Sequence, residues 1–182
     1  MAAVALLIAA TPLPEMTPVQ RLNADLLATR TATQTLEKWC AERGLADPAR
    51  VRAEVVRSEG RVVASASPAR TRLKVGKHEL LGYRKVRLMC GAHLLSEATN
   101  WYVPSRLTAE MNAALDGSDT PFGRVILPLN PHRRTFSAWL AKPGRVPPGG
   151  VVIRHRALVF DGDGRPLAEV VEHYQRILVD GG

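Results

Sequence analysis

Aromatic residues, cysteines and long apolar runs are all scarce in this 182-residue sequence. Aromatic residues make up only 5% of the chain, and no helix-turn-helix or RNA-binding signature accompanies its basic residues, so we expect no nucleic-acid partner. No apolar run reaches the roughly 20 residues that cross a bilayer, because the first one is broken at Thr11, Pro12 and Pro14. We therefore expect no integral membrane segment.

The two cysteines, Cys40 and Cys90, do not decide in which cellular compartment the protein lies. No Cys-x-x-Cys or His-x-x-His pair is present, so we expect no metal site. An even number of cysteines permits one disulfide in an oxidising compartment. Two buried free thiols in a cytosolic enzyme fit the sequence equally well.

The first residues raise the same question of location. Residues 1–10 resemble the apolar core of a secretory signal, but a signal begins with basic residues, and the first one here is Arg21. We therefore treat residues 1–16 as a signal-like or disordered N-terminal segment and residues 17–182 as a single domain. The protein is periplasmic or exported if residues 1–16 are a signal peptide.

Basic residues are abundant, with 25 Lys and Arg against 17 Asp and Glu and a formal net charge of +8. This excess favours an anionic partner: nucleic acid, an anionic membrane surface, or a small carboxylate or phosphate. At 46% hydrophobic and 23% charged, the composition is that of an ordinary globular protein. Charge alone does not choose among these partners.

Hydrophobic periodicity predicts two short amphipathic helices between residues 17 and 44. The pattern then changes, and the remaining predicted elements are strands at 51–56, 61–66, 83–90, 94–103, 151–160 and 166–179, with one helix at 105–115. The segments 68–77 and 128–150 are predicted to be irregular. This order predicts an α+β fold, a mainly antiparallel β-sheet with flanking helices.

Two charged residues fall on apolar faces of predicted strands. Side chains alternate between the faces of a strand, so Arg84 shares its face with Val86 and Leu88, and Glu172 shares its face with Val170. A lone buried ion is costly, so the two could pair with each other or jointly bind a ligand. A structural ion pair, or strands solvated on both faces, explains the same pattern. In a cleft, Arg84 would clamp a carboxylate and Glu172 would carry a proton.

Three further segments have a structural and a functional interpretation. Asn100 and Trp101 could line a pocket or pack in the core. Residues 131–134 could contact phosphate, although a solvated basic loop is the better interpretation. The turn at 161–164 resembles part of a calcium loop, but a hairpin turn explains it without the missing ligands.

Three segments in the same order resemble the chorismate pyruvate-lyase family. Residues 83–88 resemble its R-x-V-x-L strand, residues 120–124 its Pro-Leu-Gly segment, and residues 166–174 its closing strand with a key glutamate. The resemblance spans about residues 20–178. It implies a chorismate lyase-like fold and a monomeric cytoplasmic enzyme that needs no cofactor or metal. Its reaction would remove pyruvate from chorismate to give 4-hydroxybenzoate for ubiquinone biosynthesis.

Carried over by position, the resemblance gives four residues a role. Arg84 would bind the ring carboxylate, the backbone amides near Phe122 and Gly123 would help to hold it, and Glu172 would be the general acid and base. Two departures accompany the match: the 100–102 stretch replaces an Arg found in some family members, and Phe122 replaces a Leu, which would narrow the pocket.

The sequence therefore predicts a chorismate lyase-like enzyme that acts on chorismate or a related anionic aromatic precursor. The alternative is a non-catalytic binding domain for a small aromatic carboxylate with the same fold. The presence of both Arg84 and Glu172 favours the enzyme, because a sensor needs the anchor but not the proton carrier.

Overall fold

The computed structural model describes residues 15–62, 68–142, 144–146 and 150–180, without the side chains of residues 57–62. Within these ranges, six antiparallel strands form one sheet in the order β1-β2-β3-β6-β5-β4. The strands are β1 Val51–Val62, β2 Leu81–Cys90, β3 His93–Tyr102, β4 His132–Leu140, β5 Val151–Phe160 and β6 Pro166–Gln175. The helices are α1 Pro18–Ala28, α2 Ala32–Glu42, α3 Pro68–Leu73, α4 Ala109–Gly117 and α5 Phe122–Val125.

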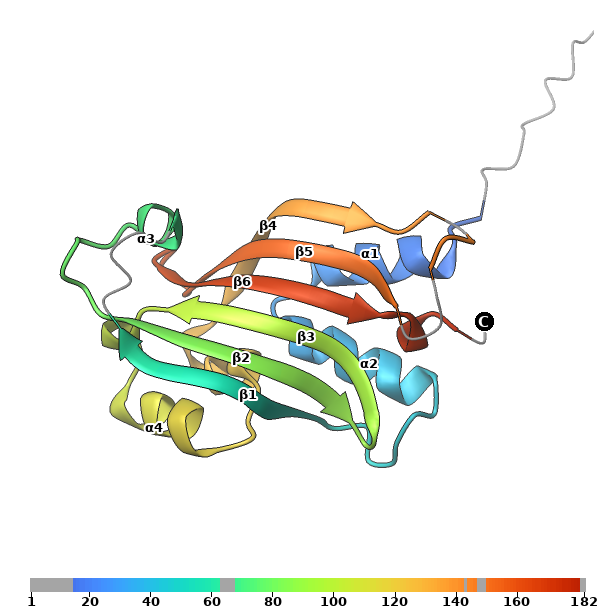
Figure 1. Cartoon of the computed structure of the whole chain (residues 1–182), viewed down its shortest axis with the longest axis horizontal. Helices are drawn as coiled ribbons and strands as arrows, with labels where there is room; N and C mark the ends of the chain where they lie inside the picture. Colours follow the sequence, from blue (N-terminus) through green and yellow to red (C-terminus); the bar gives the residue numbers. More distant parts are fainter. Residues whose placement is uncertain (1–14, 63–67, 143, 147–149, 181–182) are drawn as a thin grey trace, which may run out of the picture.

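This architecture confirms the predicted α+β fold. Helices α1 and α2 lie behind the sheet in Figure 1, which leaves its other face towards the viewer. We call the face that packs against α1, α2, α4 and α5 the inner face and the opposite one the outer face. Residues 1–14 of the predicted N-terminal segment lie outside the described residues. No helix in the described part of the chain is long and apolar enough to cross a membrane.

The first two helices form where their periodicity predicts them. Thr17 begins α1 with a capping box, in which its side chain accepts from the Gln20 amide and its own amide donates to the Gln20 side chain. Of the predicted stripe Leu22, Leu26 and Leu27 in α1, the first two are buried and Leu27 is 48% exposed; the stripe of α2, which includes Leu36, is buried. Thr31 precedes α2, but its side chain makes no capping hydrogen bond.

The predicted alternation of faces in β2 and β6 is also observed. Arg84 is buried on the inner face of β2, and Glu172 is buried on the inner face of β6. The register aligns Arg84 with Asn100 of β3, and Glu172 with Ala98 of β3. The two charged residues therefore lie in adjacent cross-strand rows of the sheet, where the parity argument places them.

Four predictions about local structure are wrong. The strands predicted separately at 51–56 and 61–66 are replaced by one continuous strand, β1, over Val51–Val62. The segment 128–150 contains the edge strand β4, and the segment 68–77 begins with α3. The strand predicted to reach 179 ends at Gln175 and is followed by a 3₁₀ turn over Arg176–Leu178. Strand β4 has little apolar alternation because much of it is exposed, so pairing with β5 rather than its own pattern defines it.

The hydrophobic core on the inner face is divided into two clusters. One joins α1 and α2 to the sheet through residues such as Leu36, Val86 and Ala98. The other joins α4 and α5 to the sheet through Phe122 and Val170, among others. A third, smaller cluster lies under α3 and covers one end of the outer face. The inner-face polar residues Arg84, Asn100, His155 and Glu172 lie along the seam between the first two clusters.

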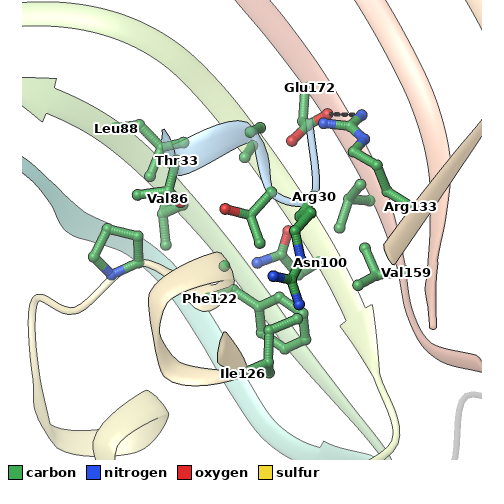
Figure 2. A pocket seen from close by; sticks show the side chains of 16 residues that line it. Arg30, Thr33, Val86, Leu88, Asn100, Phe122, Ile126, Arg133, Val159 and Glu172 are labelled. Carbon is green, nitrogen blue, oxygen red and sulfur yellow. Dashed lines mark hydrogen bonds and ion pairs between the residues drawn. The ribbon is translucent and has the colours of Figure 1, made fainter. Parts of the chain in front are cut away.

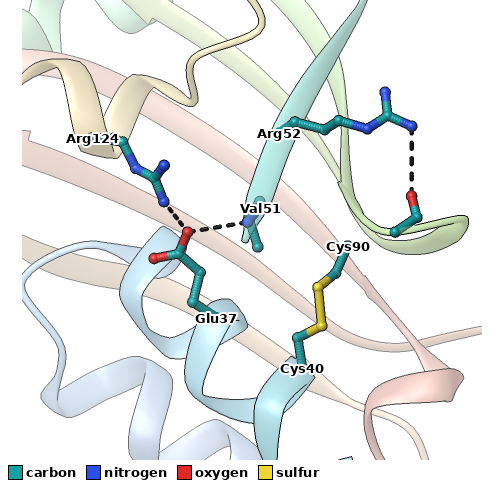
Figure 3. Close-up of a disulfide and its surroundings, with 7 residues drawn as sticks. Glu37, Cys40, Val51, Arg52, Cys90 and Arg124 are labelled. Carbon is teal, nitrogen blue, oxygen red and sulfur yellow. Dashed lines mark hydrogen bonds and ion pairs between the residues drawn. A yellow bond between two sulfur atoms is a disulfide. The ribbon is translucent and has the colours of Figure 1, made fainter. Parts of the chain in front are cut away.

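A disulfide fastens α2 to the sheet. Cys40 of α2 is bonded to Cys90 at the end of β2, with both side chains fully buried (Figure 3). One turn earlier, the Glu37 carboxylate accepts a hydrogen bond from the Val51 amide at 3.0 Å and pairs with Arg124 of α5. The structure thus selects the disulfide over two free thiols, and it couples α2, β1 and α5 into one unit.

Candidate ligand-binding site

A cavity of about 40 Å³ lies at the seam between the two core clusters. Its floor is the inner face of the sheet, and its roof is formed by the start of α2 and by α5 (Figure 2). Much of its lining is apolar and comes from Val86, Leu88, Ala98, Phe122, Ile126, Val159 and Val170. The polar lining is confined to a few side chains, the pattern that small-molecule sites share.

Glu172 lies at the deep side of the cavity, where it is paired with Arg133 of β4. The Arg133 guanidinium donates to Glu172 Oε2 at 2.7 Å, and the two side chains are only 2% and 7% exposed. Burial alone would lower the pKa of Arg133, but the charge of Glu172 and the hydroxyl of Tyr174 raise it above its ordinary value. The carboxylate is therefore held by a permanent counter-ion.

Further buried polar side chains adjoin this ion pair. His155 of β5 faces Glu172 across the strand pair, and one of its ring nitrogens lies 2.8 Å from Asn23 Oδ1 of α1. Burial lowers the pKa of His155 to about 4. The charge of Glu172 opposes this shift, and the smaller effect of Arg133 adds to it. His155 is thus neutral near pH 7. Burial and the charge of Glu172 raise the pKa of the Tyr174 hydroxyl well above its usual value.

Two uncharged polar side chains also line the cavity, Thr31 from the start of α2 and Asn100 from β3. The Thr31 hydroxyl is buried and has no hydrogen-bond partner in the structure. The Asn100 side chain is only 4% exposed and points into the cavity, where it forms none of the interactions drawn in Figure 2. Both groups are positioned to bind a ligand, which for Thr31 would supply the partner that a buried polar group needs.

Arg30 lies at the mouth of the cavity. Its guanidinium contacts the Asn130 side chain and donates from Nε to the Pro131 carbonyl oxygen at 3.4 Å. Both partners are neutral, so the charge of Arg30 is not compensated by them. Among the lining residues, two cations (Arg30 and Arg133) stand against one anion (Glu172), which leaves one net positive charge.

Phe122 and Gly123, to which the family resemblance gives a substrate-binding role, line the cavity. Helix α5 approaches the start of α2 so closely that a Cβ atom on Gly123 would lie 2.8 Å from Thr33 Oγ1 and 2.9 Å from Thr31 Cβ. Only glycine permits this approach without a shift of one helix. The Phe122 ring contacts the cavity from α5 and packs at 5.8 Å from the ring of Tyr102.

Two other predicted site residues lie elsewhere. Arg84 is buried beside the cavity, and its guanidinium donates to the carbonyl oxygens of Ser118 at 2.8 Å and Thr120 at 3.1 Å. It therefore holds the turn that precedes α5, and its role as a carboxylate anchor stays a prediction. Trp101 points to the outer face, opposite to Asn100, and packs in the cluster under α3 with its ring 4.6 Å from Tyr83.

Sequence reasoning missed the two arginines that line the cavity. The 131–134 segment is not a solvated basic loop, because Arg133 is drawn inward by Glu172. Arg30 lies in the short link between α1 and α2, where no periodic pattern marks it. The unexplained charge of Glu172 on an apolar face was the available signal, since it required a buried cation somewhere in the fold.

The described residues hold no group of three or more His, Cys, Asp or Glu side chains that could bind a metal ion. At the turn between β5 and β6, the Asp161 carboxylate instead accepts from the amides of Asp163 and Arg165. The hairpin interpretation of residues 161–164 is the one that the structure supports.

Solved structures share this chorismate lyase-like fold. The effector domain of PhnF from Mycobacterium smegmatis superposes with a TM-score of 0.54 at 11% identity, over 80% of this chain and 88% of that one. The longer PhnF structure gives a TM-score of 0.55 at 10% identity over 82% of this chain. The chain spans only 65% of that longer protein. At such low identities the likeness establishes the fold alone.

The sequence also has a relative among curated proteins. It is 38% identical over 180 residues to the uncharacterized protein y4mC of Sinorhizobium fredii, which covers 89% of this chain and 75% of that protein. The chain therefore belongs to the same family as y4mC. No family model matches it.

These comparisons correct the predicted enzyme. The PhnF structure that superposes over 80% of this chain is that of an effector domain and not of a lyase, so the predicted assignment as a lyase is overturned. The sequence offered Arg84 as the possible partner of Glu172, but in the structure Arg84 binds the carbonyl oxygens of Ser118 and Thr120 and Glu172 pairs with a different arginine. That arginine, Arg133, neutralises the carboxylate.

Proposed function

We propose that this domain binds a small organic monocarboxylate in the cavity between α2, α5 and the sheet, without chemical turnover. The observation that carries the proposal is the single uncompensated positive charge among the lining residues, next to the Thr31 hydroxyl, which has no hydrogen-bond partner among the described residues, and the buried Asn100 amide. A monocarboxylate neutralises that charge and accepts the hydrogen bonds that these groups offer.

The lining sets the orientation of the ligand. Its carboxylate would face Arg30, Thr31 and Asn100, and its apolar body would lie against the aliphatic side chains of the sheet. The carboxylate would avoid Glu172, whose like charge disfavours a second anion at close range. Ligand binding and the Arg133–Glu172 pair therefore use opposite sides of the same cavity.

The volume of the cavity limits the size of the ligand. An apolar cavity that takes up benzene measures about 150 Å³, whereas this one measures about 40 Å³. A short aliphatic carboxylate would need little adjustment. An aromatic carboxylate, the class that the family resemblance implies, would require the Phe122 ring to move. We therefore expect Phe122→Ala to favour aromatic ligands over short ones.

Isothermal titration calorimetry with acetate, butyrate, benzoate, 4-hydroxybenzoate and inorganic phosphate tests the proposal. At least one monocarboxylate should bind, and Arg30→Gln and Asn100→Leu should each weaken it about tenfold or more, since a hydrogen bond to a charged group contributes roughly 1.5–3 kcal/mol. Arg50→Gln is the matched control, because Arg50 is an exposed arginine outside the cavity.

Two results would contradict this assignment. Equal weakening by Arg30→Gln and Arg50→Gln would show that net charge alone attracts the ligand. Binding of phosphate with no binding of any monocarboxylate would replace the proposed ligand class.

A further inference from the structure

The outer face of the sheet gathers most of the aromatic residues of the chain. The sequence has nine of them, and five lie on this face: Tyr83, Trp101, Phe136, Trp139 and Phe160. Tyr83 and Trp101 lie near α3, whereas Phe136 and Trp139 are exposed on β4, at 42% and 46%. An aromatic content that is low for the whole chain is therefore locally high.

Arginines from β4, β5 and α3 stack on the aromatic rings of this face. The Arg154 guanidinium lies 4.7 Å from the centre of the Trp139 ring. Arg156 and Arg72 both lie over Phe136, at 5.5 and 5.4 Å. We call these two exposed rings and the arginines around them, including Arg134, the β4–β5 patch. Stacking holds the long side chains in place and so lowers the entropy lost when they bind an anion.

The β4–β5 patch has an excess of positive charge. Its four arginines face one carboxylate, Glu169, which pairs with Arg72 and Arg156. Arg134 and Arg154 have no ion-pair partner among the described residues; Arg134 lies over the Phe160 ring. Burial lowers the pKa of the neighbouring His173, with Arg154 and Lys85 adding to this shift and Glu97 opposing it.

The geometry argues against three other occupants of this surface. A second copy of the chain would bring the same arginines against one another, which like charges disfavour. Strand addition at the β4 edge is hindered by the irregularity between Thr135 and Ser137, since bulges are a common protection of edge strands. An acidic peptide would pair with the arginines, but its carboxylates would not stack on the two exposed rings.

We propose that the β4–β5 patch binds single-stranded nucleic acid. Arg134 and Arg154 would contact phosphates, and bases would stack on the exposed rings and on the guanidinium planes, the combination that single-strand binding surfaces share. This site lies on the opposite face of the sheet from the ligand cavity, so it does not depend on the function proposed there. It revises the expectation of no nucleic-acid partner, which rested on the low aromatic content and on the lack of a helix-turn-helix or RNA-binding signature.

Fluorescence anisotropy with a labelled 20-nucleotide oligothymidine tests this proposal. Arg134→Ala/Arg154→Ala should weaken binding tenfold or more and reduce the slope of log affinity against log salt by about 1.4, because each phosphate contact in a single strand contributes about 0.7. Trp139→Ala should weaken binding about fivefold or more through lost stacking.

The matched control is Arg21→Ala/Arg43→Ala. These two arginines also stack on an aromatic ring, at 5.5 Å from Trp39, but they lie on the helical side of the domain. This variant should bind the oligonucleotide within about twofold of the parent. Equal weakening by both double variants would overturn the proposal in favour of net charge. Displacement by polyglutamate as efficiently as by unlabelled oligonucleotide, with Trp139→Ala unchanged, would overturn it in favour of an acidic peptide.

Discussion

Replacing Glu172 with glutamine should destabilise the domain by about 3–5 kcal/mol, because it leaves the Arg133 guanidinium buried without its counter-ion. The two groups are 2.7 Å apart and their side chains are only 2% and 7% exposed, so bulk water screens the unpaired charge poorly. Domains of this kind have a total stability of roughly 5–15 kcal/mol. The substitution should therefore remove a large part of it.

Urea unfolding of the parent and of Glu172→Gln measures this loss. The control is Glu54→Gln, because Glu54 pairs with Arg52 at the same distance of 2.7 Å but both side chains are at least 40% exposed. That variant should lose less than about 1 kcal/mol. A loss below 1 kcal/mol for Glu172→Gln as well would refute the buried-pair interpretation and reopen the case for a free carboxyl group.

Three further predictions concern the same framework. The free energy of unfolding should fall by up to about 3 kcal/mol as pH drops from about 6.5 to about 4, and urea unfolding across this pH range measures it. The reason is that the unfolded chain binds a proton at His155 in this range, whereas the pKa of His155 in the native state is about 4. Cys40→Ala/Cys90→Ala should cost about 4 kcal/mol, since the bond closes a loop of 50 residues; thermal unfolding gives the change. Gly123→Ala should weaken ligand binding in calorimetry about tenfold, because its Cβ would push α5 away from α2.

Two of these predictions have a matched control variant, and the disulfide prediction has a check on the parent protein. His78→Gln should keep the pH dependence that His155→Gln reduces, since His78 is exposed. Gly117→Ala should leave ligand affinity unchanged, because nothing lies within 4 Å of its added Cβ. Intact mass with and without reductant verifies that the parent contains the disulfide. A stability that does not change with pH, or a His78→Gln control that is itself destabilised, would contradict the reasoning on His155. Equal loss of ligand affinity in Gly123→Ala and Gly117→Ala would contradict the reasoning on Gly123.

Much of the fold follows from periodicity. The stripes of α1 and α2 and the alternation in β2 and β6 are local patterns, so they place Arg84 and Glu172 on the buried face without any knowledge of their partners. The α4 region is predicted for the same reason, and Thr108 caps it with a hydrogen bond to the Met111 amide at 3.2 Å.

The partners of those charges could not be predicted, because they depend on contacts between distant segments. Glu172 contacts Arg133 only because β4 pairs with the edge of β5 that faces away from β6, and the sequence of β4 itself has no strong strand pattern. Arg84 meets the 118–120 turn across the domain rather than a ligand. The mistaken assignment of catalysis follows directly from these two unseen contacts.

The proposed monocarboxylate site is lined by Thr31, Asn100 and the start of α2. A ¹H–¹⁵N correlation spectrum recorded during titration with the tightest-binding carboxylate tests this proposal most directly. We predict saturable shifts of the Ala32 and Thr33 amides and of the Asn100 side-chain amide, with the Trp139 indole signal unmoved. Shifts confined to Trp139 and its neighbours, or no saturable shift at Asn100, would contradict the proposal.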